Sequence, residues 1–197
     1  MTIVLCPGIH DPTFTSAFLA GLTSQLPPHT TWRTTPLIVP TQTTPAFSSP
    51  HILAFLHDRA SVATHGVRQH LPLVIISFSA GVVGAIGAAW GWQAIGGQVK
   101  ALIAIDGWGV LLAGQFPIHR FSHDHFTHWS SNLLGQSTGV SFYADPAIEH
   151  LELWRSPQTA LGWQLSPKQS RYPGQTTAAQ LLISLLHDYG ELSDISL

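Results

Sequence analysis

The segment Ser77-Phe78-Ser79-Ala80-Gly81 has the residue types and spacing of a nucleophile held at a sharp turn. It ends an apolar run, 71–77 (LPLVIIS), that is typical of a buried strand, and it opens a run of small residues, 80–92, that is typical of a helix. A serine at such a junction is strained and exposed, and small residues two positions before and after it relieve the crowding. The N–H groups at the start of the helix favour a developing negative charge. We therefore predict that Ser79 is a catalytic nucleophile.

The alternative for this turn is a glycine-rich loop that only packs, or one that holds a phosphate. Gly81, Gly84 and Gly87 fall inside the expected helix and do not form the G-x-G-x-x-G pattern of dinucleotide-binding loops. No G-K-[ST] sequence follows any expected strand. The sequence therefore favours the nucleophile over the phosphate loop.

The elements that must position this serine alternate between strands and helices along the chain. Strands are expected at 2–6, 31–39, 71–77, 99–105, 116–122 and 140–144. Helices are expected at 13–26, from Ser49-Pro50 to about Gly66, at 80–92, 122–134, after Asp145-Pro146 and at 176–189, with an irregular excursion at 156–175. This alternation predicts an α/β fold: one domain, 1–197, built as a three-layer α/β/α sandwich with a mostly parallel central sheet. Ligands of such sheets bind beyond the carboxyl ends of the strands, so functional residues are sought there.

A second motif, Pro7-Gly8-Ile9-His10-Asp11, follows the first expected strand. It has the composition of a plain turn, but about 70 residues separate it from the small-x-Ser-x-small motif at the end of 71–77. A glycine-containing loop after the first strand, followed at this distance by a serine elbow, resembles the α/β-hydrolase superfamily over nearly the whole chain. The resemblance implies two backbone oxyanion donors, the N–H groups of Ile9 and Ala80. Pro7-Gly8 stands where the family usually has His-Gly, which a backbone donor tolerates.

The resemblance also implies a chain order of serine, then acid, then histidine. His150 fits the base best, since it follows the last strand expected before the terminal helix, and Asp124 fits the acid, since it follows the preceding strand. Asp106 and Asp145 remain alternative acids. The alternative bases are His123, His125 and His128.

Four histidines and an aspartate fall within ten residues, and such a cluster could ligate zinc or iron. They are His119, His123, Asp124, His125 and His128. Their spacing matches neither H-E-x-x-H nor H-x-H-x-D-H, and histidine is frequent elsewhere in the chain. We expect no metal or other cofactor, and we interpret the cluster as a polar rim around the mouth of the site.

Two residues beside the expected strand ends are candidates for the substrate pocket. Trp108 follows the strand end at Asp106-Gly107, and His10 follows the glycine loop. The interval between Asp106 and Phe116 is too short for a helical lid, so we expect an open site unless 156–175 covers it. Few charges lie near these positions, which favours a neutral or lipophilic acyl substrate.

The composition excludes several other classes of protein. The chain has 197 residues, of which 45% are hydrophobic and only 9% charged, with a formal net charge of −2, so neither a disordered chain nor a nucleic-acid-binding protein is expected. Its one cysteine, Cys6, excludes an internal disulfide. The longest apolar stretch, 80–95, is too short and too rich in glycine to span a membrane, and the first residues lack the pattern of a signal peptide. We expect a cytoplasmic protein with no integral membrane segment.

The sequence thus predicts a small, lidless serine hydrolase that acts on ester or thioester bonds of small acyl or lipid-like molecules. Two other classes remain open. One is a non-catalytic protein of the same fold that binds a hydrophobic ligand or a partner. The other is a metal-dependent hydrolase that uses the cluster from His119 to His128.

Overall fold

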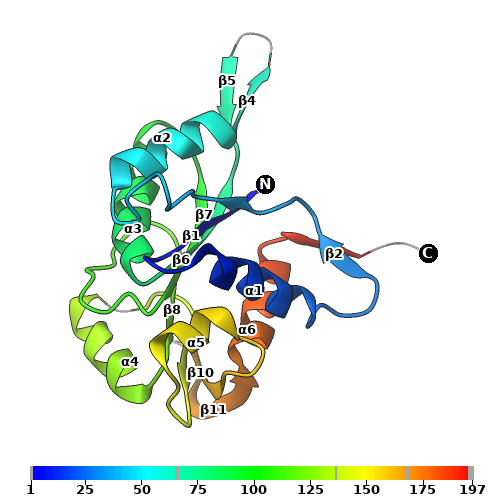
Figure 1. Cartoon of the computed structure of the whole chain (residues 1–197), viewed down its shortest axis with the longest axis vertical. Coiled ribbons are helices and arrows are strands. Elements are labelled where there is room, and N and C mark those ends of the chain that lie inside the picture. The colour runs from blue at the N-terminus through cyan, green and yellow to red at the C-terminus, as the bar shows by residue number, and fades with distance from the viewer. Residues whose placement is uncertain (1, 65–66, 136, 167–168, 195–197) are drawn as a thin grey trace.

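The computed structural model describes residues 2–64, 67–135, 137–166 and 169–194, and it is built around an eight-stranded sheet (Figure 1). The strand order is β11-β10-β9-β8-β7-β6-β1-β3. These strands are β1 (Thr2–Cys6), β3 (Leu37–Ile38), β6 (Leu73–Phe78), β7 (Val99–Ile105), β8 (Ile118–Ser122), β9 (Ser141–Ala144), β10 (Leu161–Ser166) and β11 (Gln169–Thr177). Within this sheet, the neighbouring strands β9, β8, β7, β6, β1 and β3 pair in parallel, and β10 pairs antiparallel with both β9 and β11. The expected α/β class and its mostly parallel sheet are confirmed.

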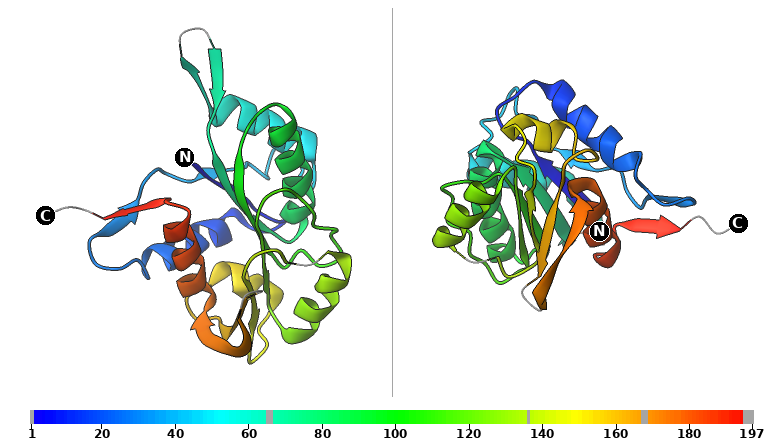
Figure 2. Two further views of the ribbon diagram at one scale, coloured as in Figure 1. Left: turned by 180° about the vertical axis from the view of Figure 1, so that it is seen from behind. Right: turned by 90° about the horizontal axis from the view of Figure 1, so that it is seen from below.

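Helices cover both faces of the sheet, which gives three layers. They are α1 (Pro12–Thr23), α2 (Ser49–Arg59), α3 (Ala80–Ala94), α4 (His125–Ser131), α5 (His150–Arg155) and α6 (Ala178–Asp188). Seen along the sheet, α3 and α4 lie on one side and α1 and α6 on the other (Figure 2). The single turn of 3-10 helix Asn132–Leu134 continues α4.

The side chains of the central strands are buried on both faces because helices pack against each. On β1, Ile3 and Leu5 join the cluster formed with α1, α5 and α6, whereas Val4 and Cys6 join the cluster formed with α2 and α3. All six residues of β6 are buried. A strand that is buried on both faces has a continuous hydrophobic sequence, which is why the run at 71–77 predicts a buried strand. Each fully buried large aliphatic side chain contributes about 1.5–3 kcal/mol to folding.

The segment 156–175, expected to be irregular, instead supplies β10 and most of β11. β10 pairs with both β9 and β11, and it is largely half-buried. Strands toward the edge of a sheet are held mainly by backbone hydrogen bonds and need no apolar run. The polar composition of 156–175 therefore did not indicate β10 and β11.

The expected strand at 31–39 is divided in two. Thr30–Trp32 forms β2, which pairs with β12 (Leu192–Asp194) in a separate two-stranded sheet, and only β3 reaches the main sheet. Pro36 precedes β3 and has no N–H group for a ladder hydrogen bond, which accounts for the interruption.

Other boundaries also differ from expectation. Helix α2 ends at Arg59 and is followed by the hairpin of β4 (Ser61–Thr64) and β5 (Val67–His70). Gly66, expected to end that helix, lies outside the described residues. Helix α5 begins at His150 rather than just after Asp145-Pro146. Within the described ranges, no helix has the length and apolar character needed to cross a membrane.

Candidate active site

The ends of β6 and β7 bring a serine and an aspartate to the same edge of the sheet. Phe78 and Ile105 are the last paired residues of these neighbouring strands, and Ser79 and Asp106 follow them directly. Both residues have a left-handed backbone, with φ of 52° at Ser79 and 50° at Asp106. Non-glycine residues seldom adopt this conformation, and it concentrates at functional sites. The surrounding hydrogen bonds hold it, including one from Ser79 N to Ile105 O of 2.9 Å.

The glycine loop after β1 packs directly against the serine turn. A Cβ atom at Gly81 would overlap the carbonyl oxygens of Cys6 and Pro7, and one at Gly8 would lie 3.0 Å from the Cβ of Ser79. Only glycine allows the two loops to approach this closely. Steric crowding between the two loops therefore explains why both motifs have glycine at these positions.

The two N–H groups expected as backbone donors belong to the glycine loop and to the start of α3. Ala80 is the first residue of α3, and Ile9 is exposed in the loop after β1. Neither N–H group donates a hydrogen bond to another group in the described parts of the chain. Ala80 also has the favourable dipole of a helix N-terminus.

His150 joins the serine to the aspartate. Its Nε2 lies 3.1 Å from Ser79 Oγ, and its Nδ1 lies 2.9 Å from Asp106 Oδ2. Because a carboxylate only accepts hydrogen bonds, His150 Nδ1 carries the proton, and Nε2 is left to accept the proton of Ser79. The three side chains thus form one continuous line of hydrogen bonds.

Aromatic stacking positions the short helix that carries His150. Trp154, also on α5, stacks on Phe18 of α1 with ring centroids 3.9 Å apart and on Phe78 at 5.1 Å. The imidazole of His150 itself stacks on Phe78 at 4.7 Å. Since Phe78 directly precedes Ser79, the imidazole of His150 stacks on the residue next to the serine.

Asp106 is shared by two histidines. Its side chain is only 1% exposed. Oδ1 accepts from the backbone N–H of His123 at 2.9 Å, and Oδ2 lies 3.0 Å from His123 Nδ1. The hydrogen bond to Asp106 holds the pKa of His123 above its usual value against the opposing effect of burial, and the charges of Asp124 and Glu149 act in the same direction. The buried carboxylate therefore has both oxygens satisfied.

Asp124, expected as the acid, caps a helix instead. Its side chain accepts a hydrogen bond of 2.6 Å from Thr127 N at the start of α4. Its contact to a histidine is with His123 Nε2 at 3.6 Å, not with His150. The carboxylate that contacts His150 is Asp106, so the expectation that Asp124 would pair with His150 is corrected. The other alternative, Asp145, accepts a hydrogen bond from Trp163 Nε1 at 2.8 Å.

The remaining histidines of the cluster point to different places. His119 is buried between Val140 and Tyr189, with Nε2 2.8 Å from the tyrosine hydroxyl, and burial lowers its pKa to about 4. His128 is also buried, and burial lowers its pKa to about 4 with help from the charges of His125 and Arg120.

His125 is exposed and rests edge-on against Tyr143. The expected polar rim therefore does not form from His119 and His128. Among the described residues, the metal-ligating side chains that converge are Asp106, His123 and His150, whose ligand atoms lie within 4.8 Å of one another.

A cavity of about 250 Å³ opens beside the hydrogen-bonded line. Its lining residues are Asp106, Trp108, His123, Phe126, Thr127 and His150. The structure thus places Trp108 in the pocket, where it donates a hydrogen bond of 3.1 Å to Ser130 Oγ. Phe126 was not foreseen, because an apolar residue in an amphipathic helix is ordinarily interpreted as core.

His10, the other pocket candidate, is not among the lining residues of this cavity. Its ring packs against those of Phe14, Phe78 and Trp154, and its Nδ1 lies 2.8 Å from Asp11 O. His10 therefore belongs to the aromatic packing around α5.

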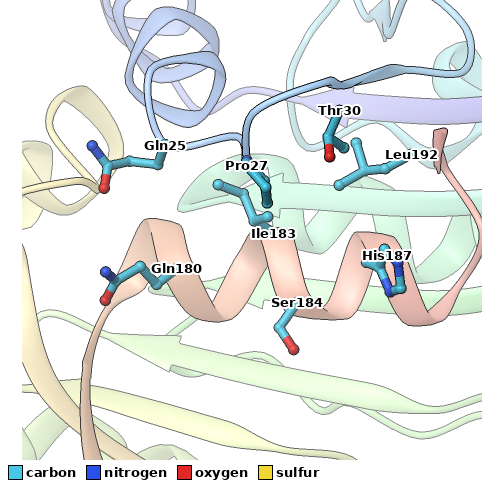
Figure 3. Close-up of a pocket in the computed structure, with 8 residues that line it drawn as sticks. All are labelled: Gln25, Pro27, Thr30, Gln180, Ile183, Ser184, His187 and Leu192. Carbon is cyan, nitrogen blue, oxygen red and sulfur yellow. The ribbon is translucent and has the colours of Figure 1, made fainter. Parts of the chain in front are cut away.

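A second cavity, of about 340 Å³, lies between the loop at Pro27 and one face of α6 (Figure 3). Ser184 and His187 both line it, yet no hydrogen bond between them occurs among the described side chains. Among the described residues, this second cavity therefore has no counterpart of the hydrogen bond between Ser79 and His150.

Comparison with known proteins adds no assignment: no protein-family model matches the chain, and no curated protein matches it with significant similarity. The function is therefore inferred from the geometry of Ser79, His150 and Asp106.

Proposed function

We propose that this protein is a serine hydrolase of the α/β-hydrolase type that cleaves neutral or lipophilic carboxylic esters or thioesters. The observation that carries the proposal is the line of hydrogen bonds from Ser79 Oγ through His150 to Asp106. A serine, a histidine and a buried aspartate in this order form the arrangement used for nucleophilic acyl transfer on several unrelated folds. The position of the serine at a strand–helix turn adds support.

The mechanism begins with proton transfer from Ser79 Oγ to His150 Nε2 as the oxygen attacks the acyl carbon. Asp106 keeps the other nitrogen of the imidazole protonated and stabilises the imidazolium that forms. The N–H groups of Ile9 and Ala80 are the donors for the negative oxygen of the tetrahedral intermediate.

Collapse of that intermediate breaks the bond to the leaving group. His150 gives its proton to the departing alcohol or thiol, and an acyl-enzyme remains on Ser79. Water then attacks the acyl carbon, with His150 again taking the proton. The bond from the acyl carbon to Ser79 Oγ breaks, His150 returns the proton to Ser79 Oγ, and the acid product leaves. No cofactor enters these steps.

The pocket suggests the class of substrate. Trp108 and Phe126 supply apolar surface, and both are about two-thirds exposed, at 65% and 66%. The titratable groups of the lining are already paired, because His123 and His150 each form a hydrogen bond with Asp106. We therefore expect an uncharged acyl group to be preferred over a charged one.

The test is hydrolysis of p-nitrophenyl esters of increasing acyl length by the wild type, Ser79→Ala and Ser77→Ala. Ser77 is the matched control, because it is buried two residues from Ser79 and its hydroxyl donates to Ile103 O rather than to the histidine. We expect Ser79→Ala to lose about 10³-fold or more in kcat/KM, and Ser77→Ala to remain within a few-fold of the wild type. Equal rates for the wild type and Ser79→Ala would overturn the proposal.

A further inference from the structure

The carboxylate of Asp106 lies between two imidazoles that offer the same kind of atom. Its Oδ2 is 2.9 Å from Nδ1 of His150 and 3.0 Å from Nδ1 of His123. The three residues come from three places in the chain: the end of β7, the segment after β8, and the start of α5. His123 is not needed for the line of hydrogen bonds to Ser79, so its convergence on the same oxygen calls for a separate explanation.

These atoms are spaced as ligands of one small divalent cation. Zinc binds histidine nitrogen at about 2.0–2.1 Å and carboxylate oxygen at about 2.0–2.2 Å, so neighbouring ligands in a tetrahedral site lie roughly 3.3 Å apart. The two distances to Asp106 Oδ2, 2.9 and 3.0 Å, differ from this value by a few tenths of an ångström, and the ligand atoms of all three residues lie within 4.8 Å of one another. Two imidazoles and one carboxylate suit zinc, whereas magnesium and calcium prefer oxygen ligands.

The site is accessible and electrostatically suited to a cation. The side chains of His150 and His123 are 41% and 25% exposed, and both line the 250 Å³ cavity, which gives an entry path and room for a water as fourth ligand. Asp124 adds a second carboxylate 3.6 Å from Nε2 of His123. With both histidines neutral, the three ligands and this neighbour carry net negative charge.

We propose that Asp106, His123 and His150 form a binding site for zinc or a similar transition-metal cation, and that the bound cation inhibits ester hydrolysis. The inhibition rests on the proposed hydrolase function, whereas the binding does not. The cation replaces the two hydrogen bonds from the Nδ1 atoms to Asp106 Oδ2, and the proton of each Nδ1 moves through solvent to Nε2 of the same ring.

The inhibition follows from the tautomer of His150. A neutral imidazole bound to a metal through Nδ1 carries its remaining proton on Nε2. Nε2 then cannot accept the proton of Ser79, although it lies 3.1 Å from Ser79 Oγ. The nucleophile stays protonated, and its reaction with an ester stops without displacement of any backbone element.

The first experiment measures ester hydrolysis by the untagged protein at increasing zinc chloride concentration, with magnesium chloride as the ionic control. The variants are His123→Gln, which loses one ligand, and His125→Gln, which alters an exposed histidine two residues away that contacts Tyr143 instead of Asp106. Rates are expressed relative to the zinc-free rate of the same variant. We expect zinc but not magnesium to inhibit the wild type and His125→Gln, and His123→Gln to need about tenfold more zinc or beyond.

The second experiment measures zinc binding directly by calorimetry in Ser79→Ala, where catalysis is not required. We expect one tight site per chain, weakened about tenfold or more by adding His123→Gln. If zinc binds in this way while the wild type hydrolyses no ester, the metal site stands and the hydrolase proposal fails. If the wild type hydrolyses esters but zinc does not bind, or inhibits His123→Gln as strongly as the wild type, the metal site is overturned.

Discussion

Ser79 and Asp106 occupy equivalent places on neighbouring parallel strands: each is the first residue beyond the paired residues Phe78 and Ile105, and each has a left-handed backbone. Parallel strands in register present their carboxyl ends at the same edge. A serine and an aspartate at the ends of adjacent strands are therefore brought close by the sheet, and His150 on α5 forms a hydrogen bond with each of them.

Exchange of the two candidate acids for asparagine should have very different effects. Asp106→Asn keeps the shape of the side chain but removes the charge and offers a donor to His150, so we expect a loss of about 10³–10⁴-fold in kcat. Asp124→Asn retains a good N-cap residue and should leave kcat within a few-fold. Ester hydrolysis by both variants decides the matter. A large loss in Asp124→Asn with a small one in Asp106→Asn would reverse the assignment.

The choice between these acids illustrates what the sequence could and could not predict. The serine turn, the glycine loop and the α/β class could be predicted, because apolar strands and small residues at turns are recognisable in short stretches of sequence. Asp106 and Asp124 both follow a strand and both lie between Ser79 and His150, and Asp124 was favoured because its strand comes directly before the last one expected. The competing signal was local: an aspartate three residues before Thr127 at a helix start is a capping residue. Which carboxylate meets His150 depends on three segments that only the fold brings together.

The contact between the glycine loop and the serine turn predicts that Gly81→Ala is costly. Its Cβ would collide with the rigid carbonyl oxygens of Cys6 and Pro7. We expect about 1–3 kcal/mol of lost stability in urea unfolding, together with reduced kcat/KM as the loop carrying Ile9 shifts.

Gly91→Ala is the matched control on the same helix, because its Cβ would meet the mobile end of the Leu53 side chain. Alanine is also the better helix former there by about 1 kcal/mol. An equal loss of stability in both variants would show that the close approach at Gly81 is not the cause.

The buried histidines predict acid sensitivity of the fold. Burial lowers the pKa of His128 to about 4, whereas an unfolded histidine titrates near 6.5. Between these values the unfolded chain binds a proton that the native protein does not, so the free energy of unfolding falls as the pH is lowered through this range. The loss reaches on the order of 3 kcal/mol at the acid end.

Urea unfolding at about pH 7 and about pH 5 measures this dependence. We expect His128→Gln to reduce the difference in free energy of unfolding between the two conditions. His187→Gln, which changes a side chain that is 67% exposed, should leave it as in the wild type. A wild-type stability that is constant or higher at the lower pH would contradict the prediction.

The exposed aromatic residues of the pocket predict a preference for longer acyl chains. Trp108→Ala or Phe126→Ala removes apolar surface and should lower kcat/KM about tenfold for p-nitrophenyl octanoate, which corresponds to ~1.4 kcal/mol of transition-state stabilisation. The loss should be smaller for p-nitrophenyl acetate. Trp90→Ala removes a half-exposed tryptophan outside this cavity and should change both esters equally. A uniform loss for both esters in the pocket variants would mean that these residues do not contact the acyl chain.

The most direct test of the central claim, that Ser79 is activated by His150, is covalent labelling with a fluorophosphonate followed by mass spectrometry of the adduct. We expect one adduct, on Ser79, that is absent in Ser79→Ala and formed much more slowly in His150→Ala. Absence of labelling in the folded wild type, or an adduct on another serine, would contradict it.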